Sequence, residues 1–165
     1  DLGKKDFMQQ ATQVFFSTTY GGECLALAAV KATIQEMREK NVNDHIWKMG
    51  RCLQDGTRKL VQQYGLDDNI KIFGLAPKFW IEFVDRNGDE FSSLKGLFFQ
   101  EAVQRGVLIG GLQYFSYSHR QEDIDDTLLA FEDACQICRH ALDEGDVDKF
   151  LEGTPPGDVF QRNRR

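Results

Sequence analysis

Two threonines and two glycines stand directly before an apolar helical pattern near the start of the chain, and these residue types suit the binding of an anion. Thr18 and Thr19 precede Gly21 and Gly22, and the alanine-rich run 24–29 follows them. Glycines let a ligand approach the backbone, hydroxyls donate hydrogen bonds, and the free N–H groups of a helix N-terminus carry partial positive charge. The pattern predicts a short strand, a turn and a helix start that bind a phosphate. A plain capped turn is the structural alternative, because strand-to-helix turns in general favour a hydroxyl and a glycine.

A histidine that closely follows two serines is the second candidate for chemistry. Ser116, Ser118 and His119 stand together shortly after the glycine pair 110–111. Imidazole can transfer a proton near neutral pH, but the chain has no nucleophile elbow and no serine, histidine and aspartate set of triad type. A histidine that forms hydrogen bonds within its own turn is therefore the alternative to a proton shuttle.

Two further patterns resemble metal or redox sites but lie in the wrong context. Cys135-x-x-Cys138 falls inside a helical pattern, whereas redox thiols acquire a low pKa at a helix N-terminus, and no second such pair completes a zinc site. The run 85–89 has its glycine one position too early for a calcium loop, and Gly96 stands where the bidentate glutamate is needed. We therefore expect ordinary buried thiols, an Asn-Gly turn and no metal.

Composition limits the classes of partner. The chain has 165 residues, a net charge of −6 and a pI of about 5.1, so no basic field attracts nucleic acid or an anionic membrane. No apolar run approaches the roughly 20 residues of a membrane helix, and the first residues do not form a signal peptide. The four cysteines are too scattered for a secreted disulfide scaffold. We expect a cytoplasmic protein without nucleic-acid or membrane partners, and a start inside a longer chain.

Hydrophobic periodicity then places these residues on elements. The predicted helices are 24–40, 43–65 capped by Asn43 or Asp44, 92–106 capped by Ser92 or Ser93, and one that opens near Gln121. The predicted strands are 69–75, 79–84, 107–109 and 114–117. The acidic start of the last helix, with Glu122, Asp123, Asp125 and Asp126, suits the helix dipole better than catalysis. This order predicts an α+β fold with helices packed on a small antiparallel sheet.

The first predicted helix differs from the others because its first half is apolar all round. Such a helix is usually buried on every side, and a chain of 165 residues has little material with which to surround it. This pattern indicates that part of the folded protein is missing from the chain.

With these pieces placed, the chain resembles the C-terminal portion of the class III pyridoxal-phosphate-dependent aminotransferases, and in particular the glutamate-1-semialdehyde 2,1-aminomutases. The segment 3–8 is similar to the basic segment that precedes a strand in that family, and 15–29 to its strand, threonine turn and alanine-rich helix. The segments 106–108 and 116–125 are similar to its "GV" and "S-x-(A/S)-H-x-x-(E/D)-D-I-D" signatures, and 151–160 to the end of some members.

The resemblance implies a fold-type I enzyme with pyridoxal 5'-phosphate that forms a homodimer. It would transfer an amino group from a small-molecule donor to a small-molecule acceptor through a Schiff-base intermediate. It implies that Thr19 hydrogen-bonds the phosphate of the cofactor in the neighbouring subunit, while Thr18, Gly21 and Gly22 shape the turn. Ser116, Ser118 and His119 would lie near the substrate. Residues 1–22 would end the large cofactor domain, 23–40 link the domains, 41–152 form the small domain and 153–165 the tail.

Two departures limit what the chain can do alone. The Schiff-base lysine of the family lies upstream, and none of Lys4, Lys5 and Lys31 has its glycine-rich context, so no catalytic residue is expected in this chain. Gly110-Gly111 replaces an acidic residue typical of the aminomutases, which favours an aminotransferase with another substrate. The alternative from another class is a free-standing α+β binding or interaction domain without catalysis, in which the first helix is covered by the chain's own strands.

Overall fold

The computed structural model describes residues 9–13, 15 and 19–155, which fall into two compact units. One unit extends to Val42 and the other begins at Asn43. The first unit contains a short 3-10 helix, η1 (Gln9–Gln13), and the helix α2 (Cys24–Glu39). The strand expected before the threonine turn falls largely outside the described residues.

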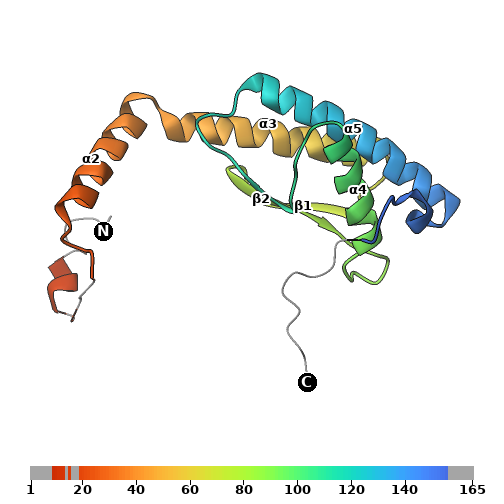
Figure 1. Ribbon diagram of the computed structural model, residues 1–165, viewed down its shortest axis with the longest axis horizontal. Helices are drawn as coiled ribbons and strands as arrows, with labels where there is room; N and C mark the ends of the chain where they lie inside the picture. The colour runs from red at the N-terminus through yellow and green to blue at the C-terminus, as the bar shows by residue number, and fades with distance from the viewer. Residues whose placement is uncertain (1–8, 14, 16–18, 156–165) are drawn as a thin grey trace. The chain divides into compact units, whose positions relative to one another are not determined.

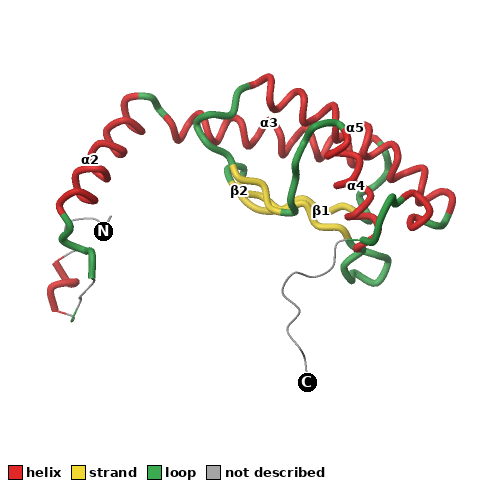
Figure 2. Tube along the Cα trace, viewed as in Figure 1, coloured by secondary structure: helices red, strands yellow, loops and turns green. Residues whose placement is uncertain are grey.

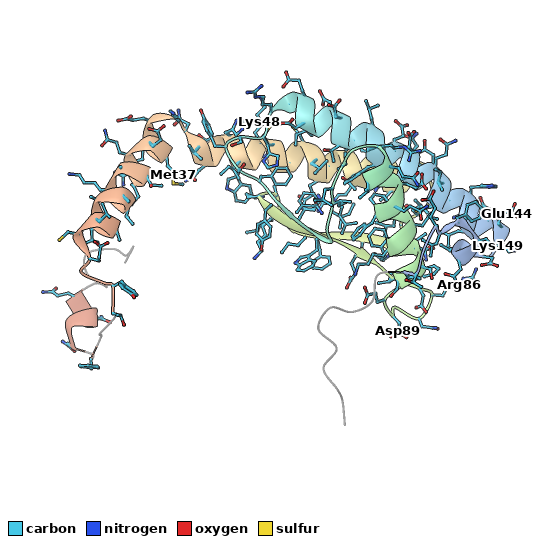
Figure 3. All side chains as sticks on the ribbon, in the orientation of Figure 1. Met37, Lys48, Arg86, Asp89, Glu144 and Lys149 are labelled. Atoms are coloured by element: carbon cyan, nitrogen blue, oxygen red, sulfur yellow. The ribbon has the colours of Figure 1, made fainter. Side chains whose placement is uncertain are left out.

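The helix α2 agrees with the predicted bounds to within one residue, and its side chains are not buried. None of its residues is buried, and Leu25 is 77% exposed. Leu27, Val30 and Ile34, spaced three and four residues apart, line a shallow groove along the helix; Figure 3 draws the side chains around the helix, with Met37 labelled. The free-standing alternative expects this helix to be covered by the chain's own strands; all three strands of the described residues belong to the second unit, so that expectation stays a prediction.

The second unit holds the remaining helices and the sheet (Figures 1 and 2). Its elements in order are α3 (Val42–Gln63), β1 (Ile70–Leu75), β2 (Lys78–Phe83), α4 (Ser92–Gln104), β3 (Leu112–Tyr114), α5 (Gln121–Glu144) and η2 (Val147–Phe150). The three strands form an antiparallel sheet in the order β1-β2-β3, with Phe73 opposite Trp80 and Trp80 opposite Leu112. The predicted α+β class, with helices packed on a small antiparallel sheet, is confirmed.

The core lies between the helices and one face of this sheet. Phe79, Ile81 and Phe83 alternate with exposed residues along β2, so a single face of the strand is buried. The Phe83 ring lies 5.3 Å from the Phe98 ring of α4, which lies 5.1 Å from the Phe131 ring of α5. This aromatic series joins the sheet to two helices.

Two of the four predicted strands differ in the structure. Residues 107–109 form no strand, because Val107 N–H bonds the carbonyl of Ala102 and so still closes the end of α4. The final strand is Leu112–Tyr114 rather than 114–117, since pairing with β2 stops where the chain turns at Ser116. Both segments were predicted from short apolar runs alone, whereas their structure depends on the backbone groups with which they pair.

Two predicted helix caps also differ. Ser92 and Ser93 lie inside α4, and the preceding residue, Phe91, occupies the cap position without a side-chain hydrogen bond. Asn43 and Asp44 lie inside the first turn of α3, which begins at Val42. There Asp44 is still favourable, because a carboxylate near the start of a helix interacts well with the helix dipole.

The Asn-Gly turn after β2 is confirmed, with Arg86 and Asp89 labelled in Figure 3. The Asp85 N–H bonds the Asp89 carbonyl, and Gly88 adopts a φ of 85° that favours glycine. The Asp85 carboxylate accepts the N–H groups of Asn87 and Asp89, and these hydrogen bonds lower its pKa. The Asp85 carboxylate therefore stabilises the turn through these hydrogen bonds.

Within the described residues, no helix combines the length and the apolar character that a membrane span requires.

Candidate functional site

The threonine turn is exposed and open in the first unit. Thr19, Gly21 and Gly22 form a turn that the Glu23 N–H closes onto the Tyr20 carbonyl at 3.2 Å. A Cβ added at Gly22 meets nothing within 4 Å, so space is free beside the backbone. The structure brings these three predicted residues together, and Thr18 lies outside the described residues.

Glu23 changes the prediction for the helix N-terminus that follows. Its carboxylate accepts the N–H groups of Leu25 at 2.9 Å and Ala26 at 2.5 Å. The expectation of free N–H groups is therefore wrong for these two donors, because the chain's own carboxylate already binds them. An anion at this turn has to use the Thr19 hydroxyl and the turn backbone instead, and Glu23 adds a negative charge nearby. The signal was present in the sequence, since Glu23 stands immediately before the first helical residue.

The three candidates of the second unit also form one turn. The His119 N–H donates to the Ser116 carbonyl at 3.3 Å, and the Ser118 N–H donates to the Ser116 hydroxyl at 3.3 Å. The His119 ring turns back so that Nδ1 lies 3.0 Å from the Ser116 N–H nitrogen. The expected alternative, a histidine that forms hydrogen bonds within its own turn, is what the structure contains.

A second histidine reaches this turn from α3, and the sequence did not indicate it. His45 Nε2 lies 2.8 Å from the carbonyl oxygen of His119, although the two residues are 74 positions apart. The His45 ring also meets the Tyr117 ring edge-on, with 5.0 Å between centroids. No local pattern marks His45, because only the packing of α3 brings it to this turn.

The cysteines of the C-x-x-C pattern are buried core residues. Cys135 and Cys138 have no exposed surface on α5. Burial raises the pKa of Cys135 to about 12 and raises that of Cys138 well above its ordinary value, with neighbouring acidic groups adding to both. Thiols in this state are poor nucleophiles, so the prediction of ordinary buried thiols is confirmed.

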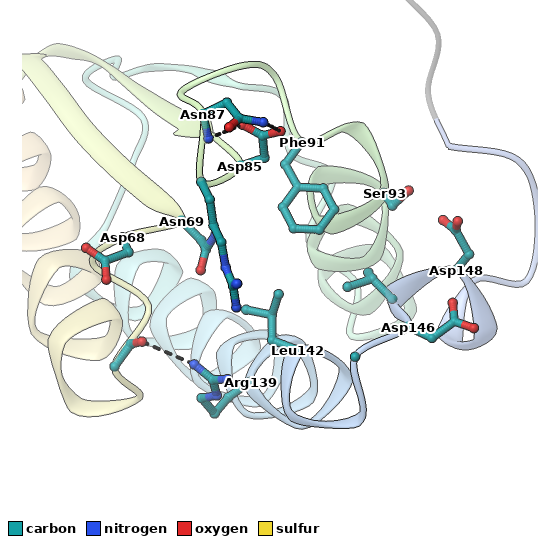
Figure 4. A pocket seen from close by; sticks show the side chains of 14 residues that line it. Asp68, Asn69, Asp85, Asn87, Phe91, Ser93, Arg139, Leu142, Asp146 and Asp148 are labelled. Carbon is teal, nitrogen blue, oxygen red and sulfur yellow. Dashed lines mark hydrogen bonds between the residues drawn. The ribbon is translucent and has the colours of Figure 1, made fainter.

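A polar cavity of about 670 Å³ lies elsewhere in the second unit (Figure 4). Asp68, Asp85, Asp146 and Asp148 line it together with Arg139. Two of these charged groups bind nearby parts of the chain. Arg139 donates to the Gly65 carbonyl and to Asp143, and the Asp85 carboxylate accepts the Asn87 N–H within its own turn. None of the predicted site residues lines this cavity, and no cluster of three metal-ligating side chains occurs among the described residues.

The chemistry available in the described part of the chain is therefore hydrogen bonding rather than bond making. No activated nucleophile is present there, and Lys31 lies exposed on α2, without a glycine-rich turn around it. The threonine turn offers a hydroxyl and backbone amides, and the Ser116–His119 turn offers hydroxyls and an imidazole. Each of these groups can form hydrogen bonds to a ligand.

Comparison with known proteins gives the chain its context. No family model matches the sequence. It is 28% identical over 145 residues to the glutamate-1-semialdehyde 2,1-aminomutase of Persephonella marina, and 29% identical over 143 residues to that of Methanothrix thermoacetophila. Each match covers 79% of this chain and 33% of the relative. The chain thus spans about a third of the length of the curated relatives it matches.

The fold is similar to that of pyridoxal-phosphate transaminases. The structure of the internal aldimine form of FumI from Sphingopyxis sp. MTA144 matches with a TM-score of 0.65 and 21% identity, over 86% of this chain and 34% of that one. At this identity the likeness concerns the fold alone. Together with the curated relatives, it confirms that the chain resembles the C-terminal portion of class III pyridoxal-phosphate-dependent aminotransferases.

Proposed function

We propose that the chain is the C-terminal part of a pyridoxal-phosphate-dependent aminotransferase or aminomutase. The observation that carries the proposal is the similarity over about four-fifths of the chain to glutamate-1-semialdehyde 2,1-aminomutases, supported by the transaminase-like fold. In the complete protein, residues 1–22 end a large cofactor domain, α2 links the domains, and 41–152 form the small domain. The complete protein is a homodimer that acts on a small amino donor and acceptor.

In this proposal Thr19 holds the cofactor phosphate bound in the neighbouring subunit. An exposed hydroxyl on an open glycine turn suits a phosphate oxygen, and Thr18, Gly21 and Gly22 shape that turn. The first N–H groups of α2 do not take part, because Glu23 occupies those of Leu25 and Ala26. The fit therefore rests on the hydroxyl and the turn backbone, and the helix N-terminus contributes little.

The small domain contributes the turn that holds Ser116, Ser118 and His119 near the substrate. Pyridoxal phosphate supplies the electron sink for amino transfer when it is bound, and the lysine that carries it lies outside this chain. Residues 1–165 alone are therefore inactive, and their part in the reaction is to bind, orient and exclude water.

Cofactor binding in the complete protein tests this function. The complete protein should bind pyridoxal phosphate and show its visible absorbance band, and Thr19→Ala should weaken retention by about 1–2 kcal/mol, roughly 5- to 30-fold. Thr33→Ala is the matched control, because the Thr33 hydroxyl bonds the Ala29 carbonyl within α2. Dissociation constants can be measured by absorbance titration.

The two parts of this proposal fail separately. A complete protein without the absorbance band would overturn the proposed function. An unchanged dissociation constant for Thr19→Ala, in a protein that does bind the cofactor, would remove only Thr19 from the phosphate site.

A further inference from the structure

The hydrogen bonds of the Ser116–His119 turn fix the protonation state of one histidine. Nδ1 of His119 lies 3.0 Å from the backbone nitrogen of Ser116, 3.2 Å from its hydroxyl oxygen and 3.4 Å from its carbonyl oxygen. The shortest of these contacts is made by a backbone N–H, which can only donate. Nδ1 must therefore accept, with an unprotonated lone pair directed at Ser116.

An accepting Nδ1 leaves one place for the ring proton. The neutral ring carries it on Nε2, and the doubly protonated ring has no lone pair at all. Protonation of Nδ1 would place an N–H group against the Ser116 N–H. The Ser116 carbonyl oxygen lies farther from Nδ1, at 3.4 Å, than the Ser116 nitrogen does.

The second histidine holds the other end of the turn. His45 Nε2 lies 2.8 Å from the His119 carbonyl oxygen, which can only accept, so Nε2 of His45 carries a proton. The Tyr117 ring packs edge-on against the same imidazole. The turn is thus tied to itself through the His119 ring and to α3 through the His45 ring.

We propose that His119 and His45 are positioning residues that together hold the Ser116–His119 turn, and that His119 does so only as its neutral Nε2–H tautomer. The Ser116 N–H donates to Nδ1 of His119, and the His119 carbonyl accepts from the His45 ring, so the two rings close the turn on itself and hold it to α3. This inference concerns the turn itself; only its consequence for a substrate rests on the proposed function.

Nuclear magnetic resonance of residues 1–165 tests the tautomer. Long-range proton–nitrogen spectra should identify His119 as the Nε2–H tautomer at neutral pH. The Ser116 amide should exchange slowly with solvent because its N–H is bonded to Nδ1. A protonated Nδ1 at neutral pH, or a Ser116 amide that exchanges as fast as an unbonded one, would overturn the proposal.

Two substitutions separate positioning from a general structural role. His119→Asn can place its side-chain oxygen near the position of Nδ1, whereas His119→Gln places its terminal groups near Nε2 instead. We expect His119→Asn to keep Ser116 amide exchange near the wild-type rate, because the asparagine oxygen can accept the same N–H. His119→Gln should speed this exchange about 3- to 10-fold, the scale of one hydrogen bond.

The controls are drawn from the same chain. His140→Asn changes an exposed histidine of α5 whose ring packs edge-on against Phe150, and it should leave the Ser116 amide unchanged. His45→Gln, which keeps a donor, should preserve the turn better than His45→Leu. Equal exchange rates in His119→Asn and His119→Gln, or in the two His45 variants, would show that these side chains act only by filling space.

Discussion

Side-chain partners decide what each candidate residue can do. Thr19 remains open on its turn, whereas Glu23 binds the N–H groups that an anion would otherwise use. His119 is committed to the Ser116 amide, so it cannot also act as a base through Nδ1. At these two positions the groups left for a ligand are therefore the Thr19 hydroxyl and Nε2 of His119.

The buried cysteines make a prediction at this scale. A thiol reagent should label the exposed Cys24 rapidly in the folded chain and leave Cys135 and Cys138 unmodified, because the reactive thiolate is suppressed by burial. The protection should persist at pH 9, since the pKa of Cys135 is raised to about 12. Mass spectrometry of samples labelled before and after unfolding measures this. Labelling of Cys138 as fast as that of Cys24 would contradict it.

The sequence predicts some of these residues better than others for a physical reason. The state of the thiols followed from their place in a helical pattern, and the Asn-Gly turn from local backbone preferences. The His45 contact could not be predicted, because it joins residues 74 positions apart through the packing of α3. The Glu23 cap was available locally but was hidden by the usual preference for hydroxyl and Asp or Asn caps.

The long helices and the strands β1 and β2 were predicted to within one or two residues, whereas the two shortest apolar runs were not. The bounds of α2 and the start of α5 agree with the periodicity, because many residues contribute to each pattern. The apolar run 107–109 is too short for its period to distinguish a strand from the end of a helix turn. Its backbone bonds lead back to α4, which is a tertiary outcome that the run itself does not contain.

The packing of α3 makes a prediction at the scale of elements. A Cβ at Gly50 would lie 2.1 Å from the Ala76 carbonyl oxygen in the β1–β2 turn. Alanine usually stabilises a helix relative to glycine, but here Gly50→Ala should destabilise the fold by about 1–3 kcal/mol because α3 and the turn must separate. Urea unfolding measures the change. Gly153→Ala, where nothing lies within 4 Å, is the control, and equal stability of both variants would contradict the prediction.

At the scale of the whole molecule, the exposed apolar helix is the main departure from an ordinary folded protein. The sequence indicated missing mass because α2 is apolar all round at its start, and the structure leaves that helix without buried residues. The curated relatives extend well beyond the matched third of their length. The domain boundaries, the homodimer and the phosphate contact stay predictions, since the chain spans only about a third of the length of these relatives.

This exposure predicts self-association of residues 1–165. Leu27 and Val30 line the groove on α2, and exposed apolar surface of this kind drives association in water. Sedimentation should be concentration-dependent at micromolar levels, and the double substitution Leu27→Lys, Val30→Lys should reduce it. Leu129→Lys, which changes an exposed leucine of α5, should have no such effect. A wild-type chain that sediments as a monomer throughout would contradict the prediction.

The uncovered face of the sheet has an optical consequence. Trp80 lies in its central strand between Phe73 and Leu112, and its side chain is 44% exposed. Indole fluorescence depends on contact with water, so any segment that covers this face shifts the emission to shorter wavelength. With Trp47 replaced by Phe, Trp80 is the one tryptophan left in the sequence. Its emission wavelength then reports whether another segment covers this face of the sheet.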